Sequence, residues 1–187
     1  MNIAHAQQQM RHAWFGGAPG MIVSASVWAV AGAVASGGGA DFPRAMWTLF
    51  IGGMAIHPLA MLLAKLLGRP GGAKGNPLER LALECTVTMI LALPLAYAVA
   101  QFRPAWFFPA MMLVIGGRFF VFATIYGLRL YWACGALLAI AGYAAVVVGL
   151  APAAAAFTSA AIEAVFGVIL FVRLRGVGAP EGLATPT

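Results

Sequence analysis

The sequence predicts an all-α protein, a polytopic membrane bundle of about six transmembrane helices with both termini in the cytoplasm. The chain has 187 residues, of which 63% are hydrophobic and only 9% charged, whereas a soluble domain averages about 25% charged residues. Its apolar residues form runs of about 20, the length that crosses a hydrocarbon layer about 30 Å thick. Because only short connections separate these runs, no extramembrane domain is expected beyond the loops.

We expect one transmembrane domain, residues 1–175, followed by a disordered tail at residues 176–187. Clusters of glycine, proline and polar residues separate the apolar runs and mark the connections. The predicted spans cover approximately residues 19–36, 43–67, 77–100, 104–127, 130–150 and 152–172.

Three local patterns refine this picture. Residues 1–15 have apolar positions near helical spacing, which predicts a short helix on the membrane surface before a glycine-rich break at 16–20. Asn76-Pro77 followed by Glu79 is typical of a helix start, with a cap, a proline in the first turn and an acid after it. In the first span, small or packing residues recur every four positions and predict a helix-packing face: Gly20, Ser24, Trp28 and Gly32.

The cations are divided unequally between the two ends of the predicted bundle. The positive-inside rule therefore places both termini in the cytoplasm. The preference for arginine over lysine, with abundant alanine and glycine, indicates a bacterium with a GC-rich genome, so the expected location is the bacterial inner membrane. A net charge of +6, carried at the ends of apolar runs, indicates anionic lipid and not nucleic acid as the partner. One end would carry Arg11, Lys65, Arg69, Lys74, Arg80, Arg129, Arg173 and Arg175, and the other Arg44 and Arg103.

A permanent cation lies inside the fourth predicted span. Arg118 has a full turn or more of hydrocarbon side chains on either side. A guanidinium does not lose its charge, and at the centre of a bilayer it costs roughly 3 kcal/mol or more on insertion scales. We therefore expect a compensating partner on a neighbouring helix.

Two acidic side chains lie at depths close to that of Arg118. At a rise of 1.5 Å per residue, Glu84 lies roughly 10 Å and Glu163 roughly 14–15 Å from the cytoplasmic ends of their helices. We expect Arg118 to be held between these two carboxylates, with Thr88 and Ser159 completing its hydrogen bonds. These five residues form the core of a predicted substrate-binding or ion-binding site. Another pairing stays open, because Glu84 also lies one turn after a base, Arg80, on its own helix.

His57 is the sixth candidate residue of this site. It lies at a similar depth beside Pro58, which is expected to kink its helix. Histidine is a common proton relay, and the alternative is a single hydrogen-bonded core histidine. No metal or haem site is predicted, because a second ligand at matching depth is missing. Cys85 and Cys134 lie in apolar segments and form neither a redox motif nor a disulfide framework.

The buried polar residues are compatible with two functions. The buried charges could line a polar cavity for an ion, a proton or a small solute in a transporter or channel-like protein. They could instead hold helices together in a non-transporting membrane subunit or interaction protein. Either protein could form a homo-oligomer. An intramembrane enzyme acting on a lipid or quinone has less support, because the chain contains no nucleophile elbow, HExxH or nucleotide-binding signature, and no catalytic residue or cofactor is predicted.

Three segments resemble a known family. They are MRHAWFGGAPG at residues 10–20, FIGGM at 50–54 and KGNP at 74–77. Together they resemble a family of small, uncharacterised bacterial multi-pass inner-membrane proteins, whose N-terminal motif is Met-Arg-x-Ala-Trp/Tyr-Phe-Gly-Gly-Ala-Pro-Gly. The resemblance covers most of the chain, short of the tail. It implies location and topology and no particular chemistry.

Overall fold

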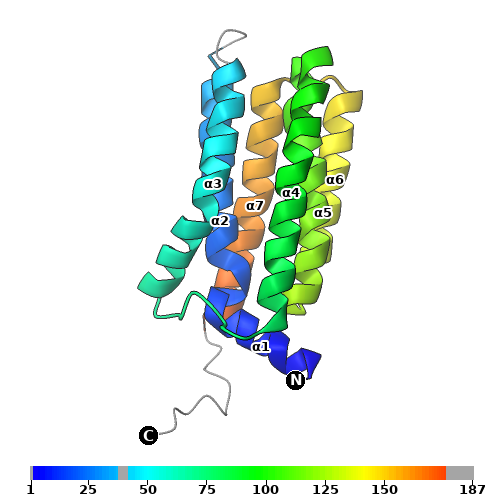
Figure 1. Ribbon diagram of the computed structural model, residues 1–187. Helices are drawn as coiled ribbons and strands as arrows, with labels where there is room; N and C mark the ends of the chain where they lie inside the picture. Colours follow the sequence, from blue (N-terminus) through cyan, green and yellow to red (C-terminus); the bar gives the residue numbers. More distant parts are fainter. Residues whose placement is uncertain (1, 38–41, 176–187) are drawn as a thin grey trace, which may run out of the picture.

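The computed structural model describes residues 2–37 and 42–175, so the predicted tail lies outside the described residues. Within them the chain is helical and has no strand, and six helical stretches are long and apolar enough to cross a membrane. The predicted fold class, an all-α bundle of six apolar helices, is confirmed (Figure 1). The long helices are α2 (Ala18–Ala35), which follows α1 (Ile3–Trp14) almost without a break, α3 (Phe42–Leu66), α4 (Pro77–Phe102), α5 (Phe107–Tyr126), α6 (Leu130–Val147) and α7 (Pro152–Leu174).

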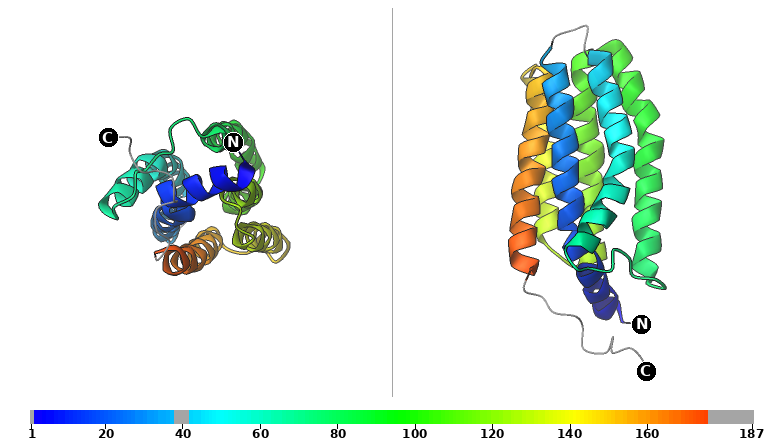
Figure 2. Two further views of the ribbon diagram at one scale, coloured as in Figure 1. Left: turned by 90° about the horizontal axis from the view of Figure 1, so that it is seen from below. Right: turned by 90° about the vertical axis from the view of Figure 1, so that its left-hand side faces the viewer.

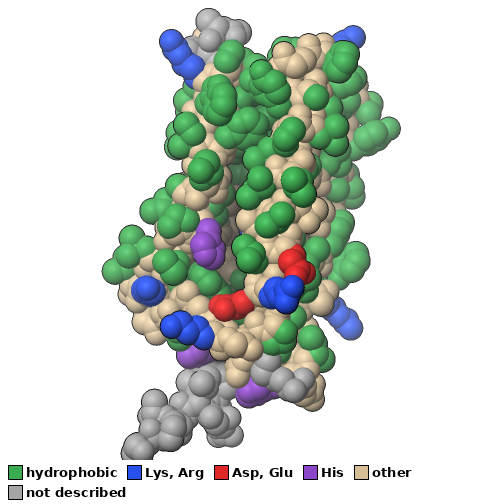
Figure 3. Space-filling view, in the orientation of Figure 1, with side chains coloured by type: hydrophobic (Ala, Val, Ile, Leu, Met, Phe, Trp, Pro, Cys, Tyr) green, Lys and Arg blue, Asp and Glu red, His purple; other side chains and the backbone are tan. Residues whose placement is uncertain are grey.

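The helices form an arc around the bundle in the order α3, α2, α7, α6, α5, α4. Each helix in this order packs on the next, with α2–α7 and α5–α6 the most extensive pairs. The view along the bundle axis shows this arrangement (Figure 2). α3 and α4 stand at the two ends of the arc, and the surface is hollowed between them (Figure 3). α2, α5 and α7 therefore contribute most of the interior.

Glycines set the close approach of α5 and α6. A Cβ on Gly116 would lie 2.8 Å from the carbonyl oxygen of Gly135, and a Cβ on Gly135 would lie 2.6 Å from the carbonyl oxygen of Gly116. The two backbones thus touch without intervening side chains, as in small-residue interfaces of membrane helices. Between α2 and α7, a Cβ on Gly32 or on Gly167 would lie 3.1–3.4 Å from atoms of the opposite helix, most of them in side chains, so these glycines also permit close packing.

The N-terminal helix α1 crosses one end of the bundle (Figure 2). Its buried residues include Met10, and its Gln7 and Arg11 side chains donate hydrogen bonds to the Thr124 and Tyr126 carbonyls at the end of α5, at 2.7 and 2.6 Å. These bonds satisfy carbonyls that a helix end leaves free. The predicted helix before the glycine-rich break is therefore present, and it closes this end of the bundle.

The break between α1 and α2 depends on two glycines. Gly16 has φ 60° and Gly17 has φ 87°, which favour glycine over other residues. The hydroxyl of Tyr131 donates a 2.6 Å hydrogen bond to the Gly16 carbonyl, and a Cβ on Gly17 would lie 2.2 Å from that hydroxyl oxygen. Conformation and space both require glycine here, so the chain can turn sharply into the bundle.

α4 begins at the predicted helix start, Asn76-Pro77. Asn76 caps the helix by accepting a 3.0 Å hydrogen bond from the Leu78 amide, and Pro77 is the first residue of the helix. The Asn76 side chain also donates a 2.9 Å bond to the Ala6 carbonyl of α1, while the Glu79 carboxylate accepts a bond from the Ala73 amide. This helix start thus also fixes α1 against the bundle.

Charged side chains mark the ends of the bundle, while apolar side chains cover its length (Figure 3). Arg44 and Arg103 lie where α3 begins and α4 ends, at the end opposite α1. The other cations that were assigned to the loops and termini lie at the α1 end. The unequal division of charge is therefore present in space, and the cytoplasmic location of the α1 end stays a prediction.

Candidate functional site

Arg118 lies half-buried on α5 and points toward α4. Its Nη2 donates a hydrogen bond to the Thr86 hydroxyl at 3.2 Å, and its Nη1 donates to the Met89 sulfur at 3.4 Å. The guanidinium carbon also lies 4.8 Å from the centre of the Phe122 ring, a cation–π contact. The third donor, Nε, is buried without a hydrogen-bond partner. Neutral groups from two helices therefore surround the cation.

The expected pairing of Arg118 with Glu84 is wrong. Glu84 accepts a 3.1 Å ion pair from Arg80 Nε on its own helix, and both side chains are exposed, at 58% and 85%. This is the alternative that the sequence left open. The hydroxyl of Thr88 donates to the Glu84 carbonyl at 3.0 Å and does not bond to Arg118. Glu84 and Thr88 thus play no part in compensating the buried cation.

Glu163 is the fully buried acid of the bundle, at 0% exposure. Eleven residues separate it from each end of α7, which places it roughly 16 Å from either end. Neither carboxyl oxygen has a hydrogen-bond partner, so the expected pairing with Arg118 is wrong for this acid too. The charge of Arg118 acts on Glu163 only through space, from the neighbouring helix α5.

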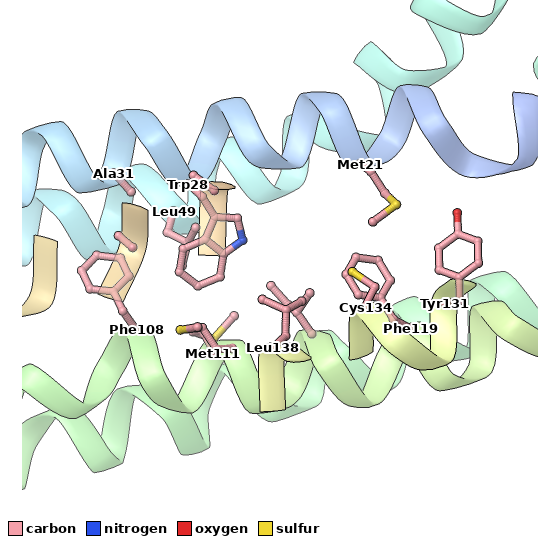
Figure 4. Packing of buried hydrophobic residues seen from close by; sticks show 14 of the residues in the cluster. Met21, Trp28, Ala31, Leu49, Phe108, Met111, Phe119, Tyr131, Cys134 and Leu138 are labelled. Atoms are coloured by element: carbon pink, nitrogen blue, oxygen red, sulfur yellow. The ribbon is translucent and has the colours of Figure 1, made fainter. Parts of the chain in front are cut away.

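Several polar side chains gather beside the Glu163 carboxyl without completing its hydrogen bonds. Ser24 and Trp28 approach it from α2 and Cys134 from α6. The indole of Trp28 extends from α2 into the interior on the side of Leu138, while Cys134 lies further along the bundle, across from Met21 (Figure 4). One turn before Glu163 on the same helix, the Ser159 hydroxyl is also buried without a partner. We call Glu163, Ser159, Ser24 and Trp28 the Glu163 cluster.

His57 has no recorded contact with the Glu163 cluster. Its ring lies 5.4 Å from the ring of Trp14, at the end of α1. Pro58 follows it inside α3, and Figure 1 shows the second half of α3 bending away from the bundle, as expected where a proline removes a helical hydrogen bond. The structure therefore joins His57 to α1 and does not bring it into contact with Arg118 or Glu163.

Two grooves lie along the helices. One, of about 480 Å³, follows the outer side of the α2–α7 seam and has an almost entirely apolar lining. The other, of about 320 Å³, lies between α4 and α5 and includes Arg118 in its lining. Glu163 lines neither of them. The acid and the base of the predicted site thus lie in separate surroundings, one in the interior and one beside a lateral groove.

The sequence contained signals for some of the residues that it did not assign. Phe122 lies four residues after Arg118, a spacing that places the two on one helix face. Ser24 and Trp28 belong to the predicted packing face of the first span, which the structure directs at α7. Thr86 and Met89 had no such signal, because their role depends on how α4 is rotated about its axis.

Comparison with known families assigns the chain to one family. A model described as a family of unknown function (DUF7010) matches residues 3–173. The chain belongs to the DUF7010 family. No curated protein and no solved structure matches the chain. The expectation of an uncharacterised family is thereby confirmed, while the bacterial source and the N-terminal motif stay predictions. The six apolar helices of this DUF7010 member indicate that it is a membrane protein.

Proposed function

We propose that this DUF7010 member is a small transporter that moves a proton or a small monovalent cation through the bacterial inner membrane, using Glu163 as the binding group. The observation that carries the proposal is the position of this carboxyl: it is fully buried at the middle of a spanning helix, and neither oxygen has a hydrogen-bond partner. Ionisable residues at such depth commonly mark ion or proton pathways.

The buried position of Glu163 makes an isolated negative charge costly. An ionised carboxylate in an apolar interior costs several kcal/mol unless an opposite charge and hydrogen bonds offset it. Glu163 has no such bonds, so it requires a proton or a cation from outside the protein. The neighbouring hydroxyls of Ser159 and Ser24 offer two further oxygen ligands, and hard cations prefer oxygen ligands.

A purely structural role explains Glu163 less well than it explains Arg118. A structural ion pair needs both partners in contact, whereas neither carboxyl oxygen of Glu163 has a partner and Arg118 bonds to Thr86 and Met89 instead. Arg118, by contrast, links α5 to α4 through Thr86 and Met89. This linkage gives Arg118 a structural role between α4 and α5. Such a role is what the second candidate function, a non-transporting membrane subunit, would require.

The α2–α7 seam is the element that would move. Transport requires access to Glu163 from each side of the membrane in turn. α7 packs most extensively on α2, and its buried residues include the small side chains Ala155, Ala156 and Ala160. Small side chains permit sliding and rocking of packed helices without large clashes. In the conformation described here the carboxyl is closed off from both ends, as in an occluded state.

The test is proton flux in proteoliposomes that contain a trapped pH-sensitive dye, with a potassium diffusion potential as the driving force and with sodium or potassium gradients as separate arms. We expect Glu163→Gln to reduce the flux at least tenfold. Glu84→Gln makes the same chemical change at an exposed carboxylate and is expected to leave the flux at the wild-type level. Size-exclusion chromatography and far-UV circular dichroism establish that each variant is folded.

Two results would overturn the transport proposal. One is a wild-type flux equal to that of protein-free liposomes in every cation arm. The other is a folded Glu163→Gln variant with wild-type flux. Either result would leave the non-transporting membrane subunit as the function that the structure supports.

A further inference from the structure

The groove between α4 and α5 combines an apolar wall with one permanent cation. Along α4 it is lined by Cys85, Thr88, Met89 and Ala92, and along α5 by Leu113, Val114, Gly117, Arg118 and Val121. Its volume of about 320 Å³ falls within the 300–1,000 Å³ that is typical of small-molecule sites. The lining therefore has the composition of a site for an amphiphile with a polar head and an apolar chain.

The charge of Arg118 is not neutralised by the protein. Its hydrogen-bond acceptors are a hydroxyl and a thioether, and its ring contact is with Phe122. Three acids lie in the part of the chain that the structure describes: Glu84 is paired with Arg80, Glu79 accepts a hydrogen bond from the Ala73 amide, and neither carboxyl oxygen of Glu163 has a partner. The buried Nε donor has no partner either. Charge complementarity thus calls for an anion at this groove.

The groove is open to the surrounding lipid. α4 is exposed along most of its length, including Leu91 and Leu95, and Leu113, which lines the groove on the α5 side, is exposed as well. A Cβ built on Gly117 meets nothing within 4 Å, so the wall beside Arg118 is open where other residues would have a side chain. An apolar chain lying in the bilayer can therefore enter from the side.

We propose that this groove binds a single-chain anionic amphiphile of the fatty-acid class, with its carboxylate on Arg118 and its chain along α4 and α5. The depth of Arg118 decides between this ligand and a phospholipid. Arg118 lies eight residues from the end of α5 at Tyr126, roughly 12 Å below that end. A phosphodiester stays charged and stays at the headgroup level, whereas a fatty acid can enter hydrocarbon in its neutral, protonated form. It then transfers its proton to water and binds as the carboxylate beside the guanidinium.

Three substitutions separate the parts of this proposal. Arg118→Gln removes the charge and is expected to weaken binding at least tenfold. Gly117→Leu keeps the charge and fills the groove, and it is expected to weaken binding by a similar factor. Gly53→Leu is the matched control, because Gly53 is also a helical glycine whose Cβ would meet nothing within 4 Å, and it lies on α3, away from this groove.

The experiment measures binding of tritiated palmitate to the purified full-length protein in a non-ionic detergent, by scintillation proximity at alkaline pH. Hexadecanol and phosphatidylglycerol serve as competitors. We expect saturable palmitate binding that neither competitor displaces efficiently, and that Gly53→Leu retains while Gly117→Leu and Arg118→Gln lose it. Folding of each variant is checked by size-exclusion chromatography.

The proposal is overturned if hexadecanol competes as well as unlabelled palmitate, because the groove would then not distinguish a carboxylate from an uncharged hydroxyl. It is also overturned if phosphatidylglycerol displaces palmitate and binds more tightly, or if folded Gly117→Leu binds as the wild type does. These outcomes are independent of proton flux, so the site at Arg118 and the transport function at Glu163 can fail separately.

Discussion

Arg118 and Glu163 carry opposite charges near the middle of two helices that contact each other, yet their surroundings differ. Arg118 has a hydroxyl, a thioether and an aromatic face within reach, and a groove beside it. Glu163 is completely enclosed and has no hydrogen bond. A buried charge in a membrane bundle therefore need not be paired with the nearest opposite charge, because a cation with five N–H donors can make several weaker neutral contacts instead.

The largest expected effect concerns the enclosed acid. Glu163→Leu should raise the free energy of unfolding by about 3 kcal/mol, because it removes a buried polar group that has no partner. The gain should be measured by unfolding in mixed dodecyl sulfate micelles, followed by far-UV circular dichroism. Glu163→Gln retains an unpaired polar group and should gain less. A destabilised Glu163→Leu variant would mean that the carboxyl has a bonding partner and that the contrast with Arg118 is wrong.

A smaller loss is expected where a partner of Arg118 is removed. Thr86→Val deletes the hydroxyl that accepts from Nη2 and should lower the free energy of unfolding by about 1.5 kcal/mol, the lower range for a hydrogen bond to a charged group. Thr88→Val is the matched control, because that hydroxyl bonds only to a carbonyl of its own helix. The same micellar unfolding assay applies, and equal effects at the two positions would contradict the assignment of Thr86.

The contact between Arg118 and the Phe122 ring should contribute about 1 kcal/mol, as expected for a cation–π pair that is partly shielded from water. A double-mutant cycle that combines Phe122→Leu with Arg118→Met measures this coupling directly. Additive effects of the two substitutions would show that the ring only fills space. A coupling near the expected value would add a further difference between the two charged residues, because Glu163 has no equivalent contact.

The smallest effect is expected at the exposed pair. Glu84→Gln should change the free energy of unfolding by less than about 0.5 kcal/mol, because solvent screens an ion pair between two exposed side chains. Repeating the measurement at high salt should remove even this difference. A loss of more than about 1 kcal/mol would return Glu84 to the buried network that the sequence predicted.

The sequence predicted the depth of the charged residues more accurately than their direction. Glu84 and Thr86 are two positions apart, which rotates them by about 200° about the helix axis, so one can face solvent while the other bonds to Arg118. Rise along a helix follows from residue number alone, whereas rotation depends on how the helix packs. For this reason the sequence predicted that Glu84 and Thr88 bond to Arg118, whereas Thr86 and Met89 do so.

The composition and the apolar runs by themselves determined an all-α bundle of six helices, since hydrophobic length and backbone hydrogen bonding leave few other structures in a bilayer. They also determined the unequal charge of its two ends and the start of α4 at Asn76, because these depend on neighbours in the chain. Only the tertiary structure decided that Arg118 turns to α4 and that Glu163 is enclosed by α2, α6 and α7 without a bond. Those outcomes depend on contacts between residues far apart in sequence, where the close approach of small side chains fixes which helix faces meet.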